Sequence, residues 1–174
     1  QSIWSGYVGG LISPAEFVRR PASWLNLISD TDATIAGGPN FAFDLCSEGT
    51  LRGLAADLDL STWRVAFCGA EPVRSRSLRR FAAKFRGQGL RQQALTPCYG
   101  MAEATLIVTC KSPGAEFQER LLDVVALETD RTVVGTDKAA RSVVSVGPPC
   151  LGFDIRVADS VTGDIVGEDY VGEI

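Results

Sequence analysis

The sequence predicts an α/β fold in which a parallel sheet is flanked by helices and is followed by a β-rich segment. Two short apolar runs, 33–36 and 64–68, each precede a glycine-containing loop and then a segment with apolar residues at helical spacing. Strands that alternate with helices in this way favour parallel pairing, because parallel strands need a crossover connection. Toward the carboxyl terminus, apolar and charged residues alternate over 153–157, which is typical of a half-buried strand.

The first repeat of this pattern is preceded by two helical segments. Ser13-Pro14-Ala15-Glu16 is a capping box with proline at the first helical position, where its missing N–H costs nothing. Pro21 interrupts the helix, and an apolar stripe continues over 24–29. Residues 33–36 then predict a strand that stops at a Gly-Gly-Pro sequence, and 41–46 begin another helical stretch.

The second repeat is the clearer one. Residues 64–68 predict a buried strand, 69–72 a tight loop and 75–86 an amphipathic helix. A third short strand is expected to begin at 93–95, followed by a loop over 96–100 and then by apolar residues. We expect this third repeat to continue the alternation of strand, loop and helix.

The remainder of the chain changes character. Residues 111–142 are mixed and irregular, with a short helix or strand around 121–127. From residue 142 onward the pattern favours strands, with a turn at 162–163 and returning strands at 165–166 and 171–174. Because the chain stops in mid-strand, we expect it to be a fragment of a longer protein, cut at both ends.

The composition excludes several kinds of site. Histidine is absent, so the chain cannot by itself form a Ser-His-Asp or Cys-His catalytic system or a histidine metal site. The five cysteines are scattered and contain no Cys-x-x-Cys pair, so we expect buried, reduced thiols. No apolar run approaches the roughly 20 residues that cross a bilayer, and the first residues lack a basic signal region. We therefore expect a cytoplasmic protein without stable membrane insertion.

The charge is small but unevenly distributed. A net charge of −4 argues against a nucleic-acid-binding protein. Residues 74–91 form a basic stretch, which could dock an acidic partner. The simpler interpretation is the solvated face of an amphipathic helix, since Leu78, Phe81 and Phe85 recur at helical spacing on the other side.

Three loops are expected to meet at one edge of the sheet: 37–41, 69–72 and 98–103. Ligands of parallel sheets bind beyond the carboxyl ends of the strands. Each loop contains glycine, which permits a close backbone approach or a positive φ. Neither the G-x-x-x-x-G-K-[ST] nor the G-x-G-x-x-G phosphate-binding pattern is present, so the loops alone do not identify the ligand.

Tyr99 and Glu103 are the candidate chemical groups of the third loop. Tyr99 offers a flat ring on which an adenine could stack, and Glu103 could hold Mg²⁺ beside phosphate charge. Alternatively, Tyr99 is a half-buried core aromatic and Glu103 caps or solvates a following helix. Spacing alone does not decide between the two interpretations.

Four strings, in order along the chain, resemble a known family. CYGMAEATLIVT (98–109) resembles the adenine- and metal-binding signature of adenylate-forming enzymes. It has the version typical of fatty acyl-AMP ligases, in which alanine stands in place of the threonine usual in acyl-CoA synthetases. The other similar segments are GGPNFAFDLC (37–46), GAEPVRSRSLRRFAAKF (69–85) and SVGPPCLGFDIRVADSVTGDIVGEDYVGEI (145–174), the last resembling the entry to a small β-barrel subdomain.

The resemblance implies a domain organisation and a reaction. Residues 1–110 would be a partial α/β nucleotide- and acyl-binding subdomain, 111–142 an insertion or linker that disfavours coenzyme A as acceptor, and 143–174 the start of the β-barrel subdomain. A fatty acid would react with Mg-ATP to form acyl-adenylate and pyrophosphate. The acyl group would then pass to an acyl carrier protein or a polyketide synthase carrier domain.

The resemblance also assigns residues by position. Glu103 would bind Mg²⁺ and act in catalysis together with Ala102. The residues that would contact the nucleotide are Gly69, Ala70, Glu71, Pro72, Tyr99, Gly100 and Met101. Those that would contact the acyl substrate are Gly38, Asn40, Phe41 and Phe43, of which the two phenylalanines would shape the acyl channel.

Some features depart from the family pattern or are absent. Cys68 stands where the resemblance leads us to expect asparagine. The serine-, threonine- and glycine-rich phosphate loop, the ribose-binding aspartate and the lysine of the C-terminal lid lie outside this sequence, so the fragment alone should not complete adenylation. Two alternatives stay open: an acyl-CoA synthetase, and a non-catalytic module that binds nucleotide or carrier protein.

Overall fold

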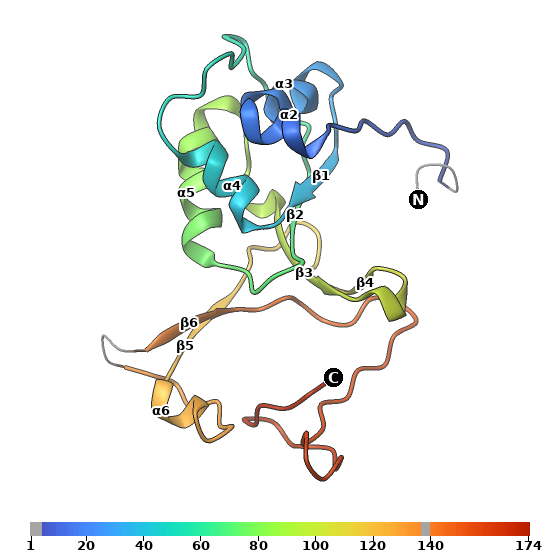
Figure 1. Ribbon diagram of the computed structural model, residues 1–174, viewed down its shortest axis with the longest axis vertical. Coiled ribbons are helices and arrows are strands. Elements are labelled where there is room, and N and C mark those ends of the chain that lie inside the picture. The colour runs from blue at the N-terminus through green and yellow to red at the C-terminus, as the bar shows by residue number, and fades with distance from the viewer. Residues whose placement is uncertain (1–4, 137–139) are drawn as a thin grey trace.

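The structure, a computed structural model, describes residues 5–136 and 140–174. Figure 1 shows an upper α/β part and a lower, more open part formed by the later residues. The helices are α2 (Pro14–Arg19), α3 (Ala22–Asp30), α4 (Asn40–Ser47), α5 (Ser75–Phe85) and α6 (Val124–Leu127). The strands are β1 (Ile35–Gly38), β2 (Val65–Cys68), β3 (Leu95–Gly100), β4 (Ile107–Cys110), β5 (Glu119–Leu122) and β6 (Arg141–Val144). Short 3₁₀ turns are η1 (Arg86–Gln88), η2 (Gln92–Ala94) and η3 (Ala102–Ala104).

The upper part contains a four-stranded sheet in the order β1-β2-β3-β4. Strands β1, β2 and β3 are parallel, which confirms the predicted fold class, and β4 is antiparallel to β3. The connections β1-α4-β2 and β2-α5-β3 supply the crossovers that parallel neighbours require. Helices α4 and α5 pack against each other beside this sheet (Figure 1).

The helix boundaries follow the sequence signals closely. The backbone N–H of Glu16 donates to the Ser13 hydroxyl oxygen at 3.2 Å, so the expected cap is present at the start of α2. Pro21 separates α2 from α3 and precedes the first residue of the second helix. Helix α5 ends one residue before its predicted end.

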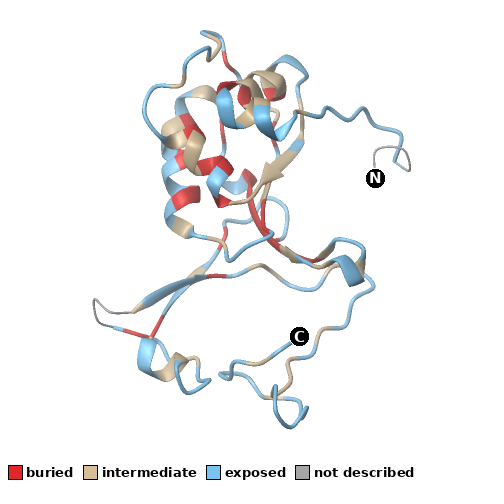
Figure 2. Ribbon diagram, viewed as in Figure 1, coloured by how far each residue is buried: buried red, intermediate tan, exposed pale blue. Residues whose placement is uncertain are grey.

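An aromatic cluster forms the core between the helices and the sheet. Phe43 of α4 packs edge-on against Phe81 of α5, with ring centroids 5.1 Å apart, and Trp24 of α3 lies 5.6 Å from Phe43. Trp63 joins them from the segment before β2, and its indole N–H donates to the carbonyl oxygens of Ala36 and its own near neighbour Val65. Buried residues therefore concentrate in the upper part, as Figure 2 shows.

The third repeat differs from the prediction. Residues 96–100, expected as a loop, belong to β3, and the segment after them forms η3 and then β4 rather than a helix. Thr105, Ile107, Val108 and Thr109 are β-branched, which favours a strand over a helix in the segment that follows η3. Strand β4 is therefore the outer strand of the sheet, beside β3.

The later residues are less regular than expected. Strands β5 and β6 pair antiparallel, and this hairpin joins the predicted segments 111–142 and 143–174 across their boundary. Strands were expected at 153–157, 165–166 and 171–174. In their place, the described residues show isolated antiparallel bridges from Ala158 to Ile165 and to Glu173. Short alternating segments without a sheet to cover one face gain little from extended pairing.

Helices that combine the length and the apolar character needed to cross a membrane do not occur in the described ranges.

Candidate functional site

The three candidate loops meet at one edge of the sheet, as predicted. Gly38, the last residue of β1, is in register with Cys68 at the end of β2, and Cys68 is in register with Pro97 of β3. Each loop leaves its strand at the carboxyl end. The first two loops are also joined directly, because the backbone N–H of Asn40 donates to a carboxylate oxygen of Glu71 at 2.8 Å.

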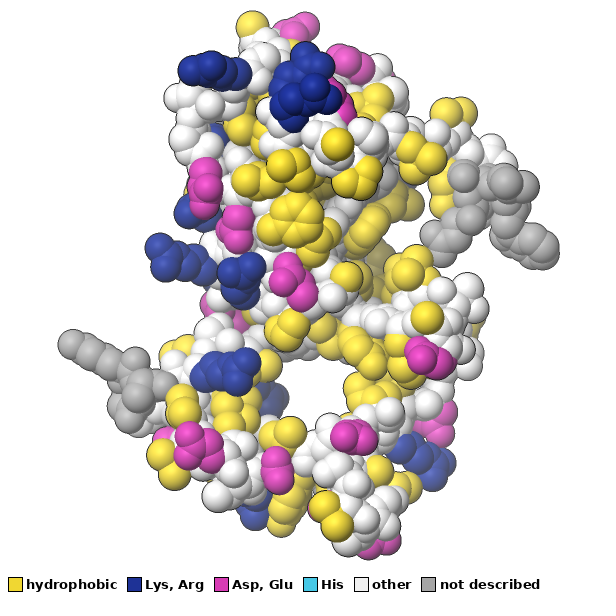
Figure 3. All heavy atoms as spheres, in the orientation of Figure 1, with side chains coloured by type: hydrophobic (Ala, Val, Ile, Leu, Met, Phe, Trp, Pro, Cys, Tyr) yellow, Lys and Arg dark blue, Asp and Glu magenta, His cyan; other side chains and the backbone are white. Residues whose placement is uncertain are grey.

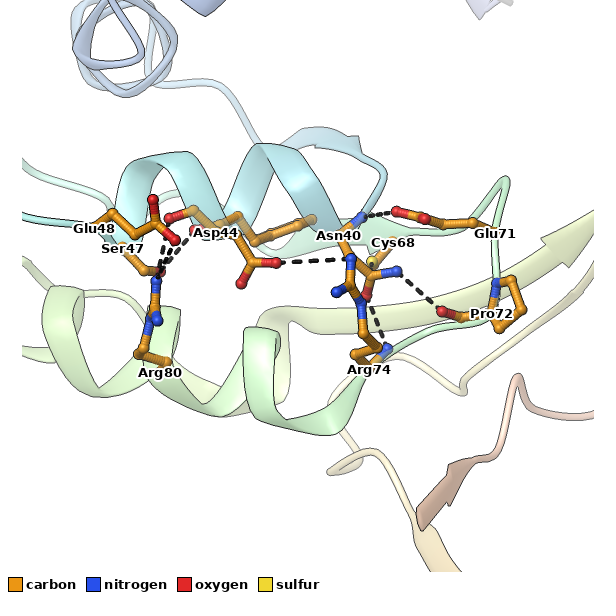
Figure 4. A network of polar contacts seen from close by, with 10 residues as sticks. Asn40, Asp44, Ser47, Glu48, Cys68, Glu71, Pro72, Arg74 and Arg80 are labelled. Atoms are coloured by element: carbon orange, nitrogen blue, oxygen red, sulfur yellow. Dashed lines mark hydrogen bonds and ion pairs between the residues drawn. The ribbon is translucent and has the colours of Figure 1, made fainter. Parts of the chain in front are cut away.

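The side chain of Asn40 extends this connection (Figure 4). Its amide nitrogen donates to the carbonyl oxygen of Pro72 at 3.0 Å, and its amide oxygen accepts the backbone N–H of Arg74 at 2.8 Å. The thiol of Cys68 lies 3.8 Å from the same oxygen. Burial raises the pKa of Cys68 to about 12, so the thiol is neutral and can act as the donor. Both ends of the Asn40 side chain are therefore used within the protein, and its expected contact with an acyl substrate stays a prediction.

The loop glycines are required by the protein's own backbone. A Cβ on Gly69 would lie 2.8 Å from the carbonyl oxygen of Cys98, and one on Gly37 would overlap Phe67 in the next strand. A Cβ on Gly100 would overlap the carbonyl group of Leu106. Close approach between strands thus explains these glycines before any ligand is considered.

The third loop turns sharply and exposes its acidic residue. Thr105 has φ +69° and ψ −52°, and the Leu106 N–H donates to the Ala104 carbonyl oxygen at 2.9 Å, which defines a γ-turn. This conformation is uncommon and strained for a residue with a side chain. It follows η3, which carries Glu103 on the surface of the molecule.

Glu103 suits one of the roles expected of it. Within the ranges that the structure describes, its carboxylate has no ion pair and no hydrogen-bonded side chain, so it could bind a cation. No cluster of three or more metal-ligating side chains occurs among the same residues. Mg²⁺ is usually held by one or two carboxylates together with substrate phosphates and water. Glu103 therefore fits a metal that arrives with a nucleotide.

Tyr99 and Met101 lie beside each other at the end of β3. The ring of Tyr99 is half-buried, and its hydroxyl group approaches the Met101 sulfur at 3.7 Å. The residues at the tip of the second loop, Ala70, Glu71 and Pro72, are exposed, and Ala70 has a positive φ of +67°. Of the candidate nucleotide residues, Gly69 is buried, and the others form an exposed or half-buried rim along the carboxyl ends of β2 and β3.

The two phenylalanines expected at an acyl channel separate. Phe41 is 48% exposed and lies on the surface near Phe17. Phe43 is fully buried in the aromatic cluster, where Trp24 and Phe81 surround its ring. Phe43 is therefore a core residue, because its position in α4 points its ring toward α5. Phe41 keeps the exposure that a channel residue would need.

One hollow of the surface lies away from this rim. Its volume is about 290 Å³, and Ile35, Val65 and Gln93 contribute to its lining. Ile35 and Val65 are the first residues of β1 and β2, so the hollow lies toward the opposite edge of the sheet from the three loops.

The basic stretch is largely used within the protein. Arg80 pairs with Glu48, Arg74 lies 3.8 Å from Asp44, and Arg79 pairs with Glu119. Lys84 donates to backbone carbonyl oxygens at the end of α4. Figure 3 shows the resulting mixture of basic and acidic side chains along this flank of the molecule. These contacts support the interpretation of 74–91 as a helix face more than as a dedicated docking surface.

The cysteines are free thiols as expected but not all of them are buried, and one role was missed. The five cysteines are free, three of them buried and two half-buried. The connecting role of Asn40 was missed, because asparagine at a helix start favours a local cap and this side chain makes none. Its partners lie 32 and 34 residues away, which no local pattern reveals.

The fold and the rim of three loops define a class of protein. Residues 3–174 match the family model described as AMP-binding enzyme, and the chain belongs to this family.

Several proteins that are similar to this chain are described as ligases. The chain is 41% identical over 178 residues to the medium-chain-fatty-acid–[acyl-carrier-protein] ligase JamA of Moorena producens, covering all of this chain and 30% of that protein. The fatty acid AMP ligase of Legionella pneumophila has a crystal structure that matches with a TM-score of 0.90 and 37% identity, over 98% of this chain and 30% of that one. A fatty acyl-adenylate ligase from L. pneumophila, in complex with acyl adenylate and pyrophosphate, matches with a TM-score of 0.83 and 37% identity over 90% of this chain and 28% of that one. The chain thus spans about a third of the length of these relatives.

Proposed function

We propose that this chain is part of an ATP-dependent fatty acyl-AMP ligase that activates a medium-chain fatty acid and passes it to an acyl carrier protein. The observation that carries the proposal is the meeting of the three loops at the carboxyl ends of β1, β2 and β3. The relatives named above support the choice of fatty acid, adenylate and carrier. The free cysteines agree with a cytoplasmic enzyme, since disulfides are rare in that compartment.

The first step joins the acid to the nucleotide. A carboxylate oxygen of the fatty acid attacks the α-phosphorus of ATP, the bond to the β-phosphate oxygen breaks, and pyrophosphate leaves. Gly69, Ala70, Glu71 and Pro72 border the adenine, and Tyr99 offers its ring for stacking. Glu103 would hold Mg²⁺, which would supply positive charge against the phosphates, and the backbone from Gly100 to Ala102 would lie beside the reacting phosphate.

The second step transfers the acyl group. The phosphopantetheine thiol of the carrier protein loses its proton to solvent, its sulfur attacks the acyl carbonyl carbon, and AMP leaves with the electron pair of the mixed anhydride bond. In-line attack in the first step and thiol attack in the second depend mainly on how the reactants are positioned. Of the acyl-side residues, Gly38 and the exposed Phe41 remain at the rim, whereas Phe43 supports the helix from the core.

The test uses the full-length protein. ATP–pyrophosphate exchange is measured with octanoic acid, with and without Mg²⁺, and acyl transfer is followed by intact mass on a holo carrier protein and on coenzyme A. The proposal expects exchange that needs both the acid and Mg²⁺, and acylated carrier. Acyl-CoA without acylated carrier would identify an acyl-CoA synthetase. Nucleotide binding without exchange would identify a non-catalytic binding module.

A further inference from the structure

The loop that follows β2 depends on one distant residue for its position. In the part of the chain that the structure describes, residues 70–73 make no hydrogen bond from backbone to backbone. The tip of this loop is exposed, and Ala70 has a positive φ. Loops with so few internal bonds move readily unless side chains hold them. The hydrogen bonds that hold this one come from Asn40.

Asn40 attaches the loop at three successive points. Its backbone N–H binds the Glu71 carboxylate, its side-chain N–H binds the Pro72 carbonyl oxygen, and its side-chain oxygen accepts the Arg74 N–H. Glu71 thus places a negative charge at the amino end of α4, where the helix dipole stabilises it. Figure 4 shows these contacts converging on Asn40 from both sides.

The attachment point is itself rigid. Asn40 is fully buried, as are Phe43 and Cys46 further along α4, and α4 packs against α5. A buried side-chain amide with its hydrogen bonds made holds its neighbours firmly, because breaking any bond leaves a desolvated polar group. The Asn40 side chain thereby holds the Pro72 carbonyl group and the Arg74 N–H at the start of α4, while its backbone N–H holds Glu71 and Val73 packs against the core.

We propose that Asn40 is a positioning residue that holds the nucleotide-contacting loop 69–72 in place and that it sets the affinity for ATP without touching any substrate. This inference rests on the proposed function for the role of the loop. It differs from the role expected of Asn40 at an acyl substrate. Loss of the Asn40 side chain should therefore weaken ATP binding much more than fatty acid binding.

The chain offers a matched control in Asn26. The side chain of Asn26 donates to the Gly53 carbonyl oxygen at 2.8 Å and accepts the Ala55 N–H at 3.1 Å, so it also fixes one carbonyl and one amide of a loop. Its loop lies outside the three candidate loops. Asn26→Ala should reproduce the loss of two such hydrogen bonds without altering the rim.

The experiment compares Asn40→Ala, Asn40→Asp and Asn26→Ala in the full-length protein. KM for ATP and KM for octanoic acid are measured by pyrophosphate exchange, and Mg-ATP affinity by equilibrium titration. Asn40→Ala should raise KM for ATP by about tenfold, which is the effect of a buried hydrogen bond left unmade, and KM for the acid by less than about twofold. Asn40→Asp keeps the acceptor for Arg74 but sets a buried carboxylate against the Pro72 carbonyl oxygen, so it should raise KM for ATP at least as much as Asn40→Ala. Asn26→Ala should lower thermal stability and leave both KM values within about twofold.

Two results would overturn the inference. One is an Asn40→Ala protein whose KM for the acid rises while KM for ATP does not, and the other is equal effects of Asn40→Ala and Asn26→Ala on KM for ATP. If Asn40→Ala fails to fold, the same criteria are applied to Asn40→Asp. If the unaltered protein binds Mg-ATP but catalyses no exchange, the proposed function fails, and the ATP affinities of the same variants still decide the role of Asn40.

Discussion

The backbone of Gly100 passes so close to Leu106 that a Cβ on residue 100 would overlap the Leu106 carbonyl oxygen. This contact lies where β3 and β4 meet with a register irregularity, just beyond Tyr99. It closes the loop that carries Glu103. The geometry of the loop therefore depends on the absence of a side chain at position 100.

Gly100→Ala should destabilise the protein even without nucleotide. The added methyl group must displace the backbone of β4, and such overpacking costs about 1–3 kcal/mol. We expect a melting temperature several degrees lower in the full-length protein, measured by thermal unfolding without ligand. Gly87→Ala is the control, because a Cβ on Gly87 has nothing within 4 Å and Gly87 has no positive φ. An unaltered melting temperature in Gly100→Ala would show that the strand crossing does not require glycine.

Glu103→Ala should abolish Mg-dependent pyrophosphate exchange in the full-length protein without affecting folding. Because the side chain is exposed and has no ion pair within the described ranges, its removal should not change the melting temperature. Loss of the metal ligand should lower exchange on the order of 100-fold or more. Glu103→Asp should recover part of the activity at higher Mg²⁺ concentration.

Glu128→Ala provides the comparison for Glu103→Ala. Glu128 is also an exposed carboxylate, but it lies at the end of α6, away from the rim. Its removal should leave the exchange rate and its Mg²⁺ dependence as they were. Full exchange by Glu103→Ala at every Mg²⁺ concentration would remove the metal role from Glu103.

Glu119 should make stability fall on acidification. The hydroxyl of Ser75, together with Ser142 and the Arg79 guanidinium, lowers the pKa of this carboxyl below its ordinary value of 4.5. A lowered pKa means that the folded state holds the proton less tightly than the unfolded state. The stabilisation is therefore fully present above about pH 4.5 and is lost as the pH falls through the folded-state pKa.

Glu119→Gln should remove this dependence. The pair with Arg79 connects α5 to β5 at a partly exposed position, so at pH 7 the loss should be about 0.5–1 kcal/mol. The difference in melting temperature between Glu119→Gln and the unaltered protein should shrink as the pH is lowered from 7 to 3.5. Glu128→Gln, which removes an exposed carboxylate elsewhere, should show no such convergence. A difference that stays constant with pH would contradict the assignment to Glu119.

Features that depend on neighbours in sequence could be predicted. The cap at Ser13 and the break at Pro21 follow from backbone chemistry within one helical turn. The strand end at Cys68 follows from a short apolar run that stops at glycine. Strand β1 runs through Gly37 and Gly38, two residues past its predicted end, and parallel pairing then brings the two loops to one edge. These local rules were enough to predict the α/β class and the rim of candidate loops.

Features that depend on distant packing could not be predicted. Phe43 has the same apolar character whether it lines a channel or fills a core, and only the positions of Trp24 and Phe81 decide which. The reversal of the chain into β4 depends on a positive φ at Thr105, a conformation that threonine seldom adopts and that no sequence pattern announces. The domain boundaries at 110 and 142 and the individual roles at the rim stay predictions.

Cys110 and Cys150 should form a disulfide under mild oxidation. Their sulfur atoms lie 3.6 Å apart, and the bridge between Thr109 and Pro149 holds the two backbones side by side. A disulfide needs the sulfur atoms at about 2.05 Å, so a small rotation of the side chains is enough. Burial, and then the neighbouring Cys150, raise the pKa of Cys110, so the reaction should be slow at neutral pH and faster in mild alkali. Treatment with diamide, which accepts the two hydrogens lost, should link the peptides that contain these residues, as seen by peptide mass mapping.

Cys98 also lies near Cys110, so it shows whether proximity alone decides that Cys110 pairs with Cys150. It is the register partner of Cys110 across β3 and β4, but its thiol donates to the Cys68 carbonyl oxygen at 3.4 Å and is buried. Cys150→Ser should therefore leave Cys110 unlinked rather than shift it to Cys98, and thiol titration should then find no disulfide. A link between Cys98 and Cys110 in either protein would mean that the side chains of this hairpin do not keep the positions found here.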